Sequence, residues 1–194
     1  MSGARMNSKP WAILAILVWI RPMLSAQSAE WQQSAIDDPA HKTTTDKFVL
    51  AGAYLTPPHT QTEEPSLEVL CSKGKFRQAY IHFGGTITAE EGITGPNGNP
   101  QAKMEGRAGA RKISQHLEIA KGGTTLAADK TEFSELLKGR LSLPQADDPD
   151  SLARRLVLSV NVGEYSPGIV IQFELPADQE ALLSACDLQG KKKK

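Results

Sequence analysis

Hydrophobic and polar residues alternate early in the chain in the manner of paired β-strands. Leu67, Val69 and Cys71 share one face of a short stretch, and Glu68 lies on the other. This period of two is typical of a half-buried strand. A turn at 72–75 contains Gly74, and the apolar stretch FRQAYIHF follows at 76–83. The pattern predicts a β-hairpin.

Further strands are predicted on the same grounds. The segment KFVLAGAYL at 47–55 contains β-branched and aromatic residues, and 103–107 and 113–120 give weaker signals. The two strongest strands lie near the C-terminus at 154–163 and 169–175. Each places four apolar residues on one face: Leu156, Leu158, Val160 and Val162 in the first, Ile169, Ile171, Phe173 and Leu175 in the second.

Two short helices are predicted between and after these strands. Residues 129–138 begin with Asp129 and Glu132 at capping-box spacing. Phe133, Leu136 and Leu137 then form one apolar face, and Gly139 is expected to end the helix. A short strand is suggested by Leu141 and Leu143. A second helix is predicted at 177–185, with Leu182 and Leu183 facing inward.

The order of these elements predicts the fold class. Strands, a helix, two long strands and a helix, joined mostly by hairpin-like connections, indicate an α+β domain. We expect a twisted antiparallel β-sheet or a small β-sandwich with two short packed helices. The single domain should span residues 47–188, after a polar, turn-rich N-terminal extension at 27–46. The Gly-rich segment 84–100 favours turns over a core element.

The first residues resemble a secretory signal peptide. A basic segment with Arg5 and Lys9 precedes an apolar run from Trp11 to Ile20, and small residues follow. The alternative is a membrane anchor, but this run has ten residues, whereas a spanning helix needs about 20. We expect removal of residues 1–26, although cleavage after Ala29 is an alternative. No stable membrane span is then predicted in the mature protein.

Composition and charge narrow the classes of function. Hydrophobic residues make up 40% of the 194 residues, which suffices for a modest core. The 22 basic residues balance the 22 acidic ones, so a basic nucleic-acid-binding protein is disfavoured. Loss of the signal peptide removes Arg5, Lys9 and Arg21 and leaves the mature chain acidic. Residues 189–194 form a basic tail that we expect to be solvated and disordered.

The two cysteines of the chain are Cys71 and Cys186, and both lie in the predicted mature part. In an exported protein, two cysteines most simply form one disulfide. Two buried free thiols are the alternative if the protein is not exported. A metal site is disfavoured because no other Cys or His lies near either residue in the sequence.

Residues with catalytic or metal-binding potential are scattered. Asp37 and Asp38 precede His41 and suggest a hydrolytic or metal cluster, but the Pro39 turn favours a solvated loop. The segment with Asp147, Asp148 and Asp150 lacks the glycine and distal glutamate of an EF-hand. The sequence contains no G-x-S-x-G, P-loop, H-E-x-x-H or G-x-G-x-x-G motif. No catalytic residue, cofactor or metal is therefore predicted. His59, His82 and His116 are scattered and form no close pair suitable for metal binding, and a surface or structural role is expected for His82.

Four features occur together in an order that resembles a known family. They are the WQQS start with Asp37 and Asp38, the stretch PSLEVLCSKGK followed by YIHF, the helix TEFSELLKG, and the segment VIQFELPADQEALLSAC. In this order the chain resembles the type VI secretion-associated periplasmic proteins of the VasI/TagO-like family, from about Trp31 to Cys186. Members carry a cysteine on a mid-chain strand and another after the last helix. Arg107 corresponds to an arginine of the family pattern.

These observations give two functional hypotheses. The first is an exported, non-enzymatic envelope accessory protein of a bacterium, periplasmic or secreted, which binds an envelope protein or a cell-wall component. The resemblance implies an association with type VI secretion. The alternative is a periplasmic hydrolase whose acidic site includes Asp37 and Asp38. A secreted structural domain without a dedicated ligand is a third interpretation.

Overall fold

The fold is a single antiparallel sheet with two short helices. A computed structural model describes residues 29–56, 63–109, 111–120, 122–128, 131–141, 154–161 and 168–188. The predicted signal peptide and the basic tail lie outside these ranges. The described elements are β1 Gln32–Asp38, β2 Thr43–Ala51, β3 Ala53–Thr56, β4 Ser66–Ser72, β5 Lys75–His82, β6 Gln101–Ala108, β7 Arg111–Ile119, β8 Thr125–Ala127, α1 Glu132–Leu141, β9 Arg155–Val160, β10 Ile169–Glu174 and α2 Glu180–Ala185.

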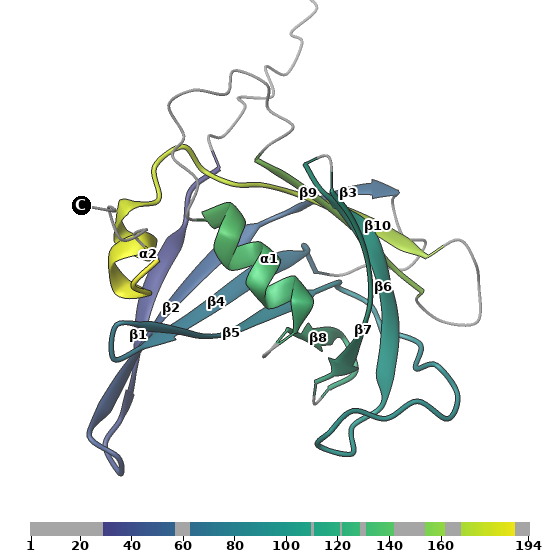
Figure 1. The fold of residues 1–194 in the computed structure, drawn as a ribbon, viewed down its shortest axis with the longest axis horizontal. Coiled ribbons are helices and arrows are strands. Elements are labelled where there is room, and N and C mark those ends of the chain that lie inside the picture. The colour runs from purple at the N-terminus through teal and green to yellow at the C-terminus, as the bar shows by residue number, and fades with distance from the viewer. Residues whose placement is uncertain are drawn as a thin grey trace, which may run out of the picture.

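The sheet is strongly curled (Figure 1). Its strand order is β1-β2-β4-β5-β8-β7-β6-β9-β10-β3, and every pairing is antiparallel. The antiparallel sheet and the two helices of the sequence prediction are confirmed. The expected α+β class overstates the helices, because the described residues form a mainly β fold with one curled sheet rather than a sandwich.

The predicted strand 47–55 is two strands, and the break explains how the sheet curls. β2 pairs with β1 and β4, whereas β3, one residue later, pairs with β10 at the far end of the strand order. Gly52 makes this change of partner possible. A Cβ atom there would lie 2.6 Å from the Phe173 ring and 3.1 Å from the Gln172 carbonyl oxygen, so the backbones approach too closely for a side chain.

The predicted hairpin of β4 and β5 is confirmed, including its turn. Lys73 and Gly74 connect the strands, and both have positive φ angles, 53° and 67°. Two positive φ values are those of a type I′ turn, whose twist matches that of the paired strands. Leu67, Val69 and Cys71 are buried, as the alternating pattern predicts.

Helix α1 lies in the hollow of the curled sheet and fills its core (Figure 1). Phe133, Leu137 and Leu141 are fully buried there among the apolar side chains of the strands. The Thr131 hydroxyl accepts the Ser134 N–H at 3.1 Å, and the Ser134 hydroxyl accepts the Thr131 N–H at 3.1 Å. This reciprocal pair caps the N-terminus.

The predicted bounds of both helices need correction. The expected cap, Asp129, lies outside the described residues, and Gly139 does not end α1, which continues to Leu141. Leu141 therefore belongs to a helix rather than to the expected short strand, because its side chain completes the buried face. α2 begins at Glu180 instead of residue 177, since the Asp178 carboxylate accepts the Glu180 N–H at 3.0 Å and starts the helix there.

The expected N-terminal extension contributes to the sheet. Within residues 27–46, β1 pairs along its whole length with β2, from Gln32 opposite Val49 to Asp38 opposite Thr43. The alternation typical of a strand is missing because β1 is exposed on both faces. The domain therefore begins before residue 47. β8 was also not predicted, because three residues are too few to show a period.

Candidate functional site

A cleft lies between the chain that enters β1 and the chain that runs from β10 through α2. It has a volume of about 800 Å³. One wall is the segment Ala29–Trp31, which leads into β1, and the other runs from Pro176 through α2 to Ser184. We call it the α2 cleft. It is bounded by the chain leaving β10 and the chain entering β1, so residues far apart in the sequence form one site.

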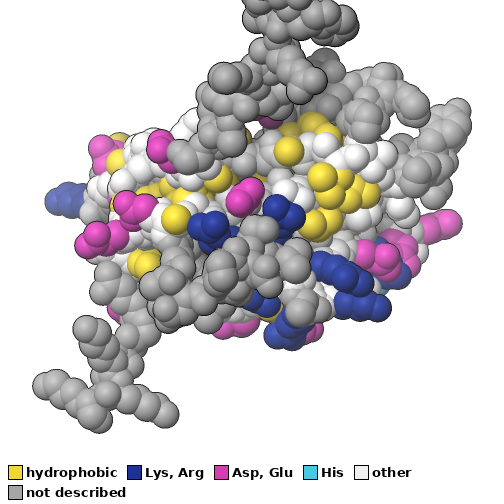
Figure 2. Space-filling view, turned by 90° about the horizontal axis from the view of Figure 1, so that it is seen from above, with side chains coloured by type: hydrophobic (Ala, Val, Ile, Leu, Met, Phe, Trp, Pro, Cys, Tyr) yellow, Lys and Arg dark blue, Asp and Glu magenta, His cyan; other side chains and the backbone are white. Residues whose placement is uncertain are grey.

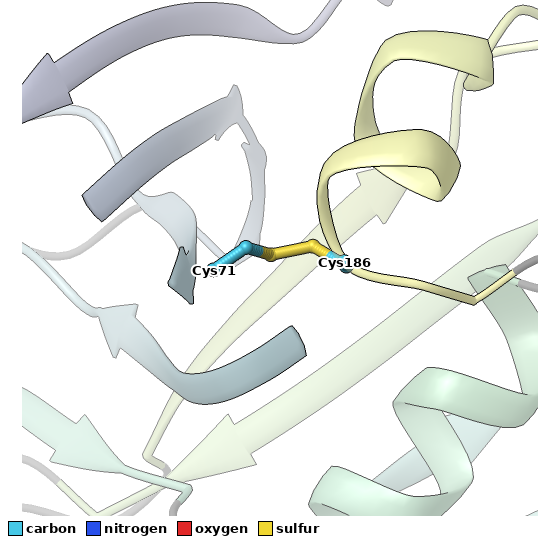
Figure 3. Close-up of a disulfide and its surroundings, with 2 residues drawn as sticks. All are labelled: Cys71 and Cys186. Carbon is cyan, nitrogen blue, oxygen red and sulfur yellow. A yellow bond between two sulfur atoms is a disulfide. The ribbon is translucent and has the colours of Figure 1, made fainter. Parts of the chain in front are cut away.

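A disulfide fastens α2, and with it one wall of the cleft, to the sheet. Cys71 of β4 and Cys186, directly after α2, are bonded with a Cα–Cα distance of 5.1 Å (Figure 3). The Phe76 N–H donates to the Cys186 carbonyl oxygen at 3.2 Å, and Leu182 is buried beside this link. The predicted pairing of the two cysteines is confirmed. α2 is six residues long, too short to be stable alone, so these contacts hold it in place.

Two polar atoms of the cleft residues have no hydrogen-bond partner. They are the indole Nε1 of Trp31, a donor, and the side-chain Oε1 of Gln179, an acceptor. Gln179 is 6% exposed. A buried polar atom without a partner costs about 1–3 kcal/mol, and native structures keep few of them. Both atoms are buried beneath the surface, so a ligand in the cleft would reach them only if neighbouring side chains moved.

The charge of the cleft is acidic. Its charged lining residues are Glu30, Asp178 and Glu180, and no basic residue lines it. Figure 2 shows several acidic side chains with hydrophobic side chains among them on its left, and a further acidic group on its right. Leu182 and Ala181 add apolar surface. The cleft therefore favours a neutral or cationic ligand with some apolar surface over an anionic one.

The acidic residues of the hydrolase hypothesis lie at the tip of the β1–β2 hairpin. Asp38 accepts the backbone N–H groups of Ala40 and His41, at 3.0 and 3.1 Å, and its other oxygen lies 2.7 Å from His41 Nδ1. The His41 hydrogen bond is the main reason that the pKa of Asp38 is lowered. Asp37 accepts the Thr44 hydroxyl at 2.9 Å. These carboxylates therefore stabilise the β1–β2 hairpin and its turn.

The other candidate residues are separated from one another. His82 faces away from the core, as predicted: its Nδ1 lies 2.9 Å from the Thr125 hydroxyl and its Nε2 3.8 Å from Glu68. His82, together with Lys47, lowers the pKa of Glu68 against the effect of burial. His116 lies 2.7 Å from Glu90.

Several sequence candidates remain without a site. Arg107 is exposed on β6, opposite Lys112. His59, Asp147, Asp148 and Asp150 lie outside the described residues. Among the described residues, no group of three or more His, Cys, Asp or Glu side chains is placed to hold a metal ion, and no helix has the length and hydropathy of a membrane span.

Comparisons with known proteins give no assignment. No protein-family model, curated protein or solved structure matches the chain. Sequence reasoning identified the disulfide but not the cleft. Trp31 was visible as the one aromatic residue of a polar segment, whereas Gln179 carries no signal that could have been read in advance.

Proposed function

We propose that the protein is an exported envelope accessory protein that binds another polypeptide in the α2 cleft and has no enzymatic activity of its own. The observation that carries the proposal is the α2 cleft itself, whose lining combines Glu30, Asp178 and Glu180 with the apolar side chains of Ala181 and Leu182. The acidic lining favours a partner with basic side chains over cell-wall material rich in carboxylates.

Two further observations support the export part of the proposal. The buried Cys71–Cys186 disulfide is typical of proteins in oxidising compartments, such as the bacterial periplasm or the medium. The N-terminal basic, apolar and small-residue order is typical of a cleaved signal peptide. The resemblance to the VasI/TagO-like family supports the same role and suggests a type VI secretion system as its setting.

Site-specific photo-crosslinking in the producing bacterium tests the proposal. A benzophenone amino acid is placed at Ala181, an exposed residue of the cleft, and in a matched variant at Lys112, an exposed residue of β7. We expect a discrete polypeptide adduct from position 181 that is absent from position 112 and weakened by Glu180→Lys, which reverses an exposed charge of the cleft. The same adduct from both positions, or no polypeptide adduct from position 181, would overturn the proposal.

Tryptophan fluorescence provides an independent measurement in solution. Trp11 and Trp19 lie within residues 1–26, so the predicted mature protein retains Trp31 as its single tryptophan. Its emission therefore reports directly on the cleft. Titration with the cross-linked polypeptide should change the Trp31 emission and protect it from acrylamide quenching. Purified peptidoglycan should leave both unchanged, and hydrolysis of peptidoglycan that is lost in an Asp37→Ala/Asp38→Ala variant would favour the hydrolase alternative.

A further inference from the structure

The free edge of β1 is an exposed hydrogen-bonding surface of the described fold. β1 is an outer strand of the sheet and pairs with β2 alone. Six of its seven residues are exposed, and the β1–β2 hairpin projects beyond the rest of the sheet (Figure 1). An outer strand presents a row of backbone N–H and C=O groups to which another strand can be added.

The middle of β1 lacks the features that usually protect such an edge. Natural edge strands carry charges, prolines or bulges that prevent further pairing. The stretch Gln32–Ile36 contains no charged residue and no proline, and its pairing with β2 shows no bulge. Ile36 is 50% exposed and is one of two large hydrophobic side chains exposed in the described part of the chain, the other being Leu55.

The sequence of β1 is complementary to itself in one antiparallel register. We propose that β1 pairs with β1 of a second copy about a two-fold axis at Ala35, so that the two sheets become continuous. All seven residues are then paired, because Ala35 is the midpoint of the strand. Asp37 lies opposite Gln33 of the other copy, and Asp38 lies opposite Gln32. Each carboxylate therefore faces an amide that can donate a hydrogen bond to it.

Neighbouring registers are less favourable. Centring the pair on Ser34 would place Asp38 opposite Glu30 of the other copy, and like charges directly opposite one another are destabilising. Centring it on Ile36 would leave the first residues of β1 without partners. Ile36 lies opposite Thr45 of β2, so its side chain is on the outer face of the sheet, away from buried Phe48. In the proposed dimer the two Ile36 side chains lie on this outer face as diagonal neighbours across the two β1 strands.

The strength expected of this dimer follows from its size. A seven-residue strand from each copy buries less surface than a stable interface, which needs about 1,000 Å² or more. We therefore expect a dimer that dissociates on dilution. This self-association is independent of the α2 cleft, because its residues are those of β1 and not those that line the cleft.

Cysteine cross-linking tests the register. In the proposed dimer the two Ala35 Cα atoms lie about 4.5–5.5 Å apart, within the range that a disulfide requires. Two Gln32 Cα atoms are separated by six residues along the strand, or about 20 Å. Under mild oxidation, Ala35→Cys should give roughly tenfold more disulfide-linked dimer than the matched variant Gln32→Cys. Equal cross-linking of the two variants, or none, would overturn the proposal.

Sedimentation velocity over a range of concentrations tests the interface without cross-linking. The wild-type protein should move from monomer to dimer as its concentration rises. Ile36→Lys should remain monomeric because it sets two ammonium groups close together, whereas Leu55→Lys, at the other exposed hydrophobic residue, should dimerise as the wild type does. A wild-type protein that stays monomeric at the highest concentration, or an Ile36→Lys variant that still dimerises, would refute pairing through β1.

Discussion

The disulfide gives the sharpest test of how this fold is stabilised. The perturbation is the double variant Cys71→Ala/Cys186→Ala, compared with the wild-type protein in the presence and absence of reductant. Both cysteines are buried, at 0% and 2% exposure. Alanine is preferred to serine in this variant because a serine hydroxyl would be buried without a partner.

The expected loss follows from the length of chain that the bond closes. Cys71 and Cys186 are separated by 115 residues. In the chain-entropy model, closing a loop of this length stabilises the folded state by about 4–5 kcal/mol, because it restricts the unfolded chain. Domains of this size have a total free energy of unfolding of about 5–15 kcal/mol. Loss of the bond should therefore remove a large share of the stability.

Urea unfolding followed by far-ultraviolet circular dichroism measures this change. The free energy of unfolding should be highest for the oxidised wild type and should fall to a common lower value for the reduced wild type and the double variant. Reductant should not affect the variant, which serves as the control. The free energies and not the midpoints are compared, because the unfolded chain without the bond exposes more surface and increases the denaturant slope.

Hydrogen exchange measures which segments lose stability when the disulfide is removed. Without the bond, α2 is held to the core by the burial of Leu182, the packing of Ala185 and the Phe76–Cys186 hydrogen bond. Protection should therefore fall in 176–188 before it falls in β9 and β10. A difference in unfolding free energy below about 1 kcal/mol would refute the argument from loop closure. Uniform loss of protection along the chain would refute the role of the bond as a local tether of the cleft wall.

Three further predictions concern the sheet, the helix and the pH dependence of stability. Gly52→Ala should lower the urea-unfolding free energy by about 1–3 kcal/mol, because its Cβ would lie 2.6 Å from the Phe173 ring; unchanged stability would contradict this close packing. Thr131→Ala should cost about 1 kcal/mol through loss of the helix cap, and Thr131→Ser, which keeps the hydroxyl, should restore it. The pKa of Glu68 is lowered in the folded protein, chiefly by His82. The charged form of Glu68 therefore stabilises the fold at pH values above the ordinary glutamate pKa of 4.5. This stabilisation is lost as the pH falls through the lowered pKa. Glu68→Gln should therefore be less stable than the wild type at neutral pH, with a gap in unfolding free energy that closes in acid; a gap independent of pH would refute this assignment.

The hairpin and the C-terminal strands were predictable because their signal is local. Leu67, Val69 and Cys71 alternate with residues on the opposite face because one side of β4 is buried and the other is not. The same is true of β9 and β10. The cysteine pair was also predictable, because two cysteines in an exported chain leave one simple pairing.

The sequence by itself thus determined the strands that bury one face, the two short helices and the disulfide. Tertiary structure decided the rest, because those features depend on which distant backbones meet. β1 is exposed on both faces, so its sequence shows no alternation. At Gly52 the chain passes from β2, which pairs with β4, to β3, which pairs with β10. The α2 cleft arises in the same way. Trp31 and Gln179 come from opposite ends of the described chain, and the path of the chain from β10 through α2 brings them to one site.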